Sequence, residues 1–141
     1  MKRQLTGWLL VPSVVLLCTA GLVAAGTPED DALKAAEIWL ELVDEGKYSE
    51  SWDGAAKLFR SAVTRQEWEK SLTGVRSPLG RVGSRKVTLK QYSTSLPGAP
   101  DGEYVVLQFE TSFENKSKAV ETVTPMKDSD GTWRVSGYYI R

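Results

Sequence analysis

The chain has 141 residues, which is room for one domain, and 18 basic residues balance 18 acidic ones to give a formal net charge of zero. With 41% hydrophobic residues it can form a packed core, and without a positive net charge it has no global electrostatic reason to bind nucleic acid. Histidine is absent and the only cysteine, Cys18, lies in an apolar N-terminal run, so a domain that begins after this run would lack imidazole and thiol chemistry, disulfides and metal sites built from these residues.

Residues 1–25 have the plan of a secretory signal peptide. Lys2 and Arg3 precede an apolar run over residues 5–25, which closes with small residues at the expected cut. We therefore expect an exported protein, periplasmic or secreted, with a single mature domain over residues 26–141. The alternative is an uncleaved inner-membrane anchor, since about 20 apolar residues can also span a bilayer. In that case this segment would be the membrane contact.

The mature region begins with a predicted helix. Thr27 can cap it, Pro28 suits the first helical position, and Gly46 is a typical residue beyond a helix end. Between them, apolar residues recur at three-to-four spacing and so form a stripe on one face. The residues of this stripe are Ala32, Leu33, Ala36, Trp39, Leu40 and Val43.

Two further helices are predicted before the strands begin. Ser49 or Ser51 can cap the second, which is the shorter one. Thr64 and Glu67 have the spacing of a capping box and start the third. That helix is expected to end before Pro78, because proline disfavours helical geometry in the residue that precedes it.

The second half of the chain predicts an antiparallel sheet of about four strands. Residues 103–114 alternate with period two, as in a strand with one buried face. Residues 81–92 form a weaker strand, and residues 119–127 and 132–140 form two more. Gly131 lies between the last two, where it can adopt the positive φ of a tight hairpin. The expected fold class is therefore α+β, with three N-terminal helices packed on a curved antiparallel sheet.

Several motifs resemble a known family. This order of elements is similar to the cone-shaped fold typified by nuclear transport factor 2, and the motifs resemble the bacterial domain-of-unknown-function family number 4019, from about Leu33 to Ile140. The resemblance implies a small exported bacterial domain and supplies neither an activity nor catalytic residues. The motifs are Arg76-Ser77-Pro78-Leu79-Gly80, the stretch from Leu96 to Tyr104, Glu121-Thr122-Val123, and the stretch from Gly131 to Ile140.

Aromatic residues are the first candidates for a binding site. A curved sheet closed by helices leaves a concave space, and ligand sites are mostly apolar with a few polar groups. A small hydrophobic ligand is the partner that such a space would favour. The alternative is that the same rings form the core. The candidate residues are Trp39, Trp52, Phe59, Phe109 and Trp133.

Two carboxylates are weak candidates for catalysis. If Glu121 points into the cone, burial would raise its pKa and it could act as a general acid or base, with Asp53 as a second carboxylate. The alternative places Glu121 on a solvated face, or pairs it with Arg85 or Arg134.

An uneven charge distribution gives the third candidate. Cations without carboxylates occupy the stretch after Glu69, whereas residues 29–53 are strongly acidic. The cations could form a basic face for an anionic partner, or they could be compensated by the acidic first helix. The residues of the predicted basic face are Arg76, Arg81, Arg85, Lys86 and Lys90, and Lys70 belongs to the same stretch.

The sequence favours a non-catalytic binding or interaction module that uses the concave sheet face, either for a ligand or for homodimerisation. A small enzyme acting on a hydrophobic ligand and an accessory protein of an envelope complex are the alternatives. We expect no cofactor, no metal and no nucleic-acid partner.

Overall fold

The computed structural model describes Gly21 and residues 26–141. The predicted signal segment over residues 1–25 thus falls, apart from Gly21, outside the described residues. No helix in the described part of the chain is long and apolar enough to cross a membrane. In chain order the elements are α1 (Pro28–Asp44), α2 (Tyr48–Asp53), α3 (Lys57–Ala62), α4 (Arg65–Arg76), a 3₁₀ turn η1 (Ser77–Leu79), β1 (Val82–Ser93), β2 (Tyr104–Phe113), β3 (Lys116–Lys127) and β4 (Trp133–Ile140).

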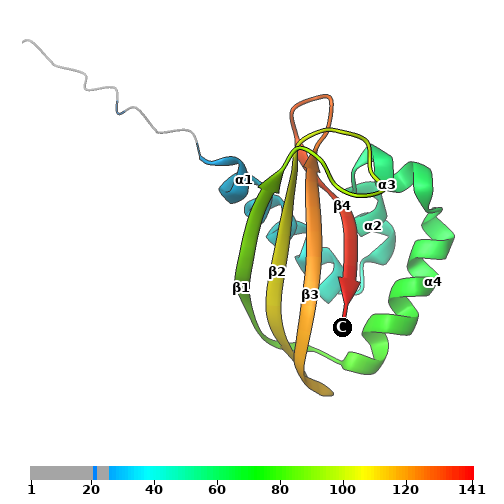
Figure 1. The fold of residues 1–141 in the computed structure, drawn as a ribbon. Coiled ribbons are helices and arrows are strands. Elements are labelled where there is room, and N and C mark those ends of the chain that lie inside the picture. The colour runs from blue at the N-terminus through cyan, green and yellow to red at the C-terminus, as the bar shows by residue number, and fades with distance from the viewer. Residues whose placement is uncertain (1–20, 22–25) are drawn as a thin grey trace, which may run out of the picture.

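The four strands form one antiparallel sheet in which sequence neighbours are spatial neighbours, in the order β1-β2-β3-β4. Helix α1 lies behind the sheet and contacts all four strands, and α4 lies on the side of β4 (Figure 1). The predicted α+β class, with helices packed on an antiparallel sheet, is confirmed. We call the sheet face turned away from α1 the open face.

Helix α1 begins and ends where its sequence signals indicate. The Thr27 side chain accepts a hydrogen bond from the Asp30 backbone N–H, and Pro28 occupies the first turn. After the helix, Gly46 has a φ of 75°, a left-handed conformation that glycine adopts at no steric cost. The apolar stripe of α1 is buried against the sheet, as the three-to-four spacing predicts.

The second predicted helix is wrong in detail, because residues 26–141 form four α-helices instead of three. The chain leaves helical geometry at Ala56, whose backbone is extended and whose N–H donates to the Val135 carbonyl of β4 over 2.8 Å. This bond to the sheet separates α2 from α3. Neither predicted serine caps α2, and Ser51 is instead buried inside it.

Strand β2 shows the period-two alternation expected of a strand with one buried face. Its inward residues, from Val105 to Phe113, are buried and pack towards α1. The hairpin between β3 and β4 turns at Gly131, which has a φ of 81° as predicted. Register shifts after Val87 in β1 and after Thr124 in β3 mark bulges that bend the sheet.

The core lies between α1 and the inner face of the sheet. Each large apolar side chain that is fully buried there contributes about 1.5–3 kcal/mol to the free energy of unfolding. The core residues are Ala32, Ala36, Trp39, Leu40, Val43, Trp68, Leu72, Val105, Leu107, Phe109, Val123 and Val135.

The capping box of α4 provides a test of this local structure. The Glu67 backbone N–H donates to the Thr64 hydroxyl oxygen, and the Glu67 carboxylate accepts from the Thr64 backbone N–H. We expect Thr64→Ala to lower the free energy of unfolding in urea by about 1 kcal/mol. Thr73→Ala, inside the same helix, is the control and should be neutral or slightly stabilising. Equal losses in both variants would contradict this role for the cap.

Candidate functional site

The predicted aromatic residues fill the space between the helices and the sheet. The Trp39 ring lies 5.4 Å from that of Tyr138 and 6.0 Å from that of Trp68, and the Phe59 ring meets Trp68 edge-on at 4.8 Å. Phe109 is buried in the same core. The interior behind the concave sheet face is thus occupied by side chains, since aromatic rings at these spacings are in contact.

Three indole N–H groups in this region donate hydrogen bonds to other protein groups. Trp39 donates to the Ser51 carbonyl over 2.8 Å, and Trp68 donates to the Ser51 hydroxyl over 3.0 Å. Trp52 donates to the Val63 carbonyl, while the Arg65 guanidinium lies 4.8 Å above its ring. Ser51 therefore joins two of the rings. The sequence singled out Ser51 only as a cap, because nothing in its spacing indicates tertiary hydrogen bonds.

Glu121 is completely buried, and its carboxylate accepts hydrogen bonds from three side chains. The Thr111 hydroxyl donates to it over 2.5 Å, the Tyr138 hydroxyl over 2.5 Å, and the Arg85 Nε over 2.7 Å. The sequence left open whether Glu121 points inward or to solvent, and offered Arg85 as one alternative partner; in the structure Glu121 points inward and pairs with Arg85. Because Glu121 has no exposed surface, a substrate in solvent cannot contact its carboxylate in this conformation.

Arg85 connects Glu121 to a second carboxylate at the end of α1. Its two terminal nitrogens donate to Asp44 over 2.6 and 2.9 Å. Arg76 donates to the same carboxylate over 2.8 Å and also lies 3.4 Å from the Tyr138 hydroxyl. Two guanidinium groups and two carboxylates thus compensate one another. We call these four residues, with Thr111 and Tyr138, the ionic network.

Burial and charge change the proton affinities within this network. Burial raises the pKa of the Tyr138 hydroxyl, and the neighbouring Glu121 charge raises it further. For Asp44, burial acts to raise the pKa, but hydrogen bonds from Arg85 and Arg76 outweigh it and hold the pKa below its usual value. Removing one partner of a buried ion pair strongly destabilises a protein, because the other charge stays buried without compensation.

The second candidate carboxylate, Asp53, is not part of this network. It lies exposed on α2 and receives two hydrogen bonds from Arg65, over 2.5 and 2.8 Å. The structure therefore does not bring Asp53 and Glu121 together.

The cations of the predicted basic face divide between two environments. Arg76 and Arg85 point inward to Asp44, and Lys90 pairs with Asp30 at 3.0 Å, so three of them compensate acidic residues of α1. Arg81 and Lys86 form no ion pair with another described residue.

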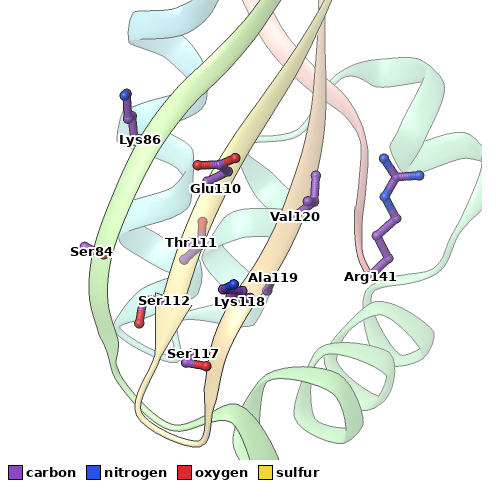
Figure 2. Close-up of a pocket in the computed structure, with 10 residues that line it drawn as sticks. All are labelled: Ser84, Lys86, Glu110, Thr111, Ser112, Ser117, Lys118, Ala119, Val120 and Arg141. Carbon is purple, nitrogen blue, oxygen red and sulfur yellow. The ribbon is translucent and has the colours of Figure 1, made fainter.

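A depression of about 670 Å³ lies on the open face of the sheet, and we call it the trough. Figure 2 shows its side chains on β1, β2 and β3, with Arg141 following β4. Three cations, one carboxylate and three serine hydroxyls line it, and none of its side chains is aromatic. Nothing in the sequence pattern singles out Lys118 or Arg141, because strand register is needed to place them beside Lys86. These polar residues are Lys86, Lys118, Arg141, Glu110, Ser84, Ser112 and Ser117.

A groove of about 430 Å³ runs between α1 and the β3–β4 hairpin, and we call it the α1–hairpin groove. Its apolar lining includes Ala35, Ile38 and Leu42 of α1, together with Trp39 and Trp133. Two of the five predicted aromatic residues thus reach one surface groove. Ile38 was missed, although a large apolar residue off the buried stripe of α1 is itself a signal.

Charged residues border this groove. Asp31 and Lys34 lie on α1, and Arg134 lies on β4. Arg134 is fixed by Asp128 at 3.0 Å and by Asp130 at 2.8 Å. The groove therefore combines an apolar floor with a polar rim, which is the usual composition of a small-molecule site.

Comparison with known proteins gives a family and a fold. The family described as Protein of unknown function (DUF4019) matches residues 35–138, which confirms the resemblance seen in the sequence motifs. Among curated proteins, none matches the chain. A solved structure of a protein from Catenulispora acidiphila is similar with a TM-score of 0.52 and 12% identity, over 79% of this chain and 88% of that one. At this identity the similarity shows the fold alone, and the likeness to nuclear transport factor 2 stays a prediction.

Removal of the Glu121 charge tests the ionic network. We expect Glu121→Gln to lower the free energy of unfolding by about 3–5 kcal/mol, because Arg85 would lose a buried partner. Chemical denaturation in urea measures the change. Asp53→Asn breaks an exposed, solvent-screened pair and should lower the free energy of unfolding much less. If the two losses were similar, the network would not have the role assigned to it.

Asp44 predicts a dependence of stability on acid pH. Its folded pKa is lower than its unfolded one, so its contribution is present above an unfolded pKa of about 3.9 and is lost as the pH falls through the folded pKa. We expect the free energy of unfolding of the unmodified protein to fall more steeply below about pH 4 than that of Asp44→Asn. Asp31→Asn, on the exposed side of α1, is the matched control. Parallel curves for the unmodified protein and Asp44→Asn would contradict the prediction.

Proposed function

The chain belongs to the family described as Protein of unknown function (DUF4019), and because that description assigns no activity, we propose a function from the surfaces of the molecule. The protein acts as a non-catalytic binding module that holds a small amphiphilic molecule in the α1–hairpin groove. The observation that carries this proposal is an apolar groove floor in which Ile38 is 57% exposed.

The apolar floor of the groove favours a ligand with an apolar body. Ile38 has the largest exposed fraction of any large apolar side chain among the described residues, and Trp133 lies opposite on β4. Covering a side chain of this size removes apolar area from water and contributes about 1.5–3 kcal/mol. The volume of about 430 Å³ falls within the range of small-molecule sites.

The charged rim of the groove favours a polar group at one end of the same ligand. The Lys34 side chain is exposed and forms no ion pair with another described residue, so its ammonium group can receive an acidic or carbonyl oxygen. The Arg134 guanidinium is already engaged by Asp128 and Asp130, which fixes that side of the groove. A molecule with an apolar body and one polar end therefore fits best.

The interior supports a non-catalytic function. The aromatic rings behind the sheet are part of the core and fill the space at its concave face. Glu121 has no exposed surface and accepts hydrogen bonds from three donors. An enzyme based on Glu121 and Asp53 would need these carboxylates to meet at an open cavity. An accessory role based on the predicted basic face has less support as well, because Arg76, Arg85 and Lys90 pair with residues of α1.

Binding of N-phenyl-1-naphthylamine, a neutral apolar fluorophore, tests the groove. We expect Ile38→Lys to weaken its binding to the folded full chain about tenfold, because an apolar contact of about 1.5 kcal/mol is replaced by a charge. Ala35→Phe should block the groove and have a similar effect. The indole N–H resonance of Trp133 should shift with the probe in the unmodified protein and should not shift in either variant.

Val75→Lys is the matched control. Val75 is also apolar, helical and 47% exposed, but it lies on α4, outside the groove. Its substitution should leave the affinity for the probe unchanged. Equal weakening by Val75→Lys and Ile38→Lys, or an unperturbed Trp133 resonance in the unmodified protein, would refute the groove as the binding site.

A further inference from the structure

Strand register places the charges of the trough in one row across the sheet. Lys86 of β1 pairs with Glu110 of β2, which pairs with Val120 of β3. Val120 in turn exchanges both backbone hydrogen bonds with Arg141. Directly paired residues of antiparallel strands point to the same face, so the row reads cation, carboxylate, apolar residue, cation on the open face.

A second row of polar groups lies beside the first. Ser84 pairs with Ser112 across β1 and β2, and Ser117 and Lys118 of β3 line the same trough. The hydroxyls are donors and acceptors, and the lysine is a donor only. The trough therefore offers donors at both ends and along one side, with the Glu110 carboxylate as an acceptor in between.

The charges of the trough are left without protein partners. The guanidinium groups behind the sheet pair with Asp44 and Glu121, whereas Lys86, Lys118, Arg141 and Glu110 form no ion pair with any described residue. Three cations against one carboxylate make the trough positive. Charge complementarity thus favours an anionic occupant, and the attraction should weaken as salt increases.

The spacing of the charges favours an elongated occupant. Lys86 lies on the outer strand β1 and Arg141 directly follows the other outer strand, β4, so they are three strand spacings or about 14 Å apart at the backbone. A single phosphate or sulfate ion midway between them would lie beside the Glu110 carboxylate, which repels it. A concave trough does not follow a flat bilayer, and without an aromatic side chain in its lining it offers no stacking surface for nucleic-acid bases.

From this arrangement we propose that the trough binds an acidic oligosaccharide. The acid groups of the sugar lie against Lys86, Lys118 and Arg141, and a sugar hydroxyl donates to Glu110. Because a carboxylate lies between the cations, the trough favours a ligand that carries both acid groups and hydroxyl donors. Glu110 would repel an oligoanion that has no such donors. The site is separate from the α1–hairpin groove and does not depend on the function proposed there.

Isothermal titration of the full chain with trigalacturonate tests the proposal. We expect saturable binding that weakens with added salt, and a loss of about three- to fivefold in affinity for each of Lys86→Gln, Lys118→Gln and Arg141→Gln. Lys70→Gln is the control, because Lys70 is exposed on α4 and forms no ion pair with another described residue. If Lys70→Gln weakened binding as much as Lys118→Gln, the attraction would be diffuse and the trough would not be the site.

Glu110→Gln separates an acidic sugar from other anions. If a sugar hydroxyl donates to Glu110, this variant should bind trigalacturonate with lower affinity. If charge attraction alone holds the ligand, removal of the Glu110 charge should raise the affinity. Tripolyphosphate, which has no hydroxyl donors at its centre, should bind the unmodified protein less tightly and should gain affinity in the Glu110→Gln variant. Tighter binding of tripolyphosphate, or stronger trigalacturonate binding by Glu110→Gln, would overturn the assignment to an acidic sugar.

Discussion

The pairing of two arginines with two carboxylates, of which Arg76 and Glu121 are buried, connects all four strands of the sheet with α1 and α4. Asp44 lies at the end of α1, Arg76 at the end of α4, Arg85 on β1 and Glu121 on β3, while Thr111 of β2 and Tyr138 of β4 complete the contacts. A charge removed from water must be compensated, so these elements can only approach one another in an arrangement that brings the four groups together. The ionic network thus constrains both the register of the sheet and the position of the helices on it.

This constraint also determines where function can lie. The inner face of the sheet is covered by rings that contact one another and by the ionic network, in which the terminal nitrogens of Arg76 and Arg85 are hydrogen-bonded. Two surfaces of the described residues carry the binding sites that we propose: the α1–hairpin groove, which exposes apolar groups, and the trough, which exposes charges. The two differ in chemistry and lie on different elements, so a ligand of one would not compete directly with a ligand of the other.

Local signals were enough to predict most of the fold. Period-two alternation located the strands, and the capping residues located the starts of α1 and α4. The break at Ala56 was missed because it depends on a hydrogen bond to Val135, far away in the chain. The same limit applies to the site: Glu121 could be singled out from its strand, but the alignment of Lys86 with Arg141 follows from a register that runs through three strand pairs.

The bond between Ala56 and Val135 also protects one side of the sheet from self-association. β4 is an outer strand, and the backbone groups of an outer strand can pair with a strand of another molecule. The Ala56 N–H occupies the Val135 carbonyl, and α3 contacts the same strand, so this edge is blocked. At the other edge, β1 is bulged after Val87 and carries three charged side chains, which disfavours a regular ladder with a neighbour. Both edges of the sheet thus disfavour pairing with a strand of another molecule.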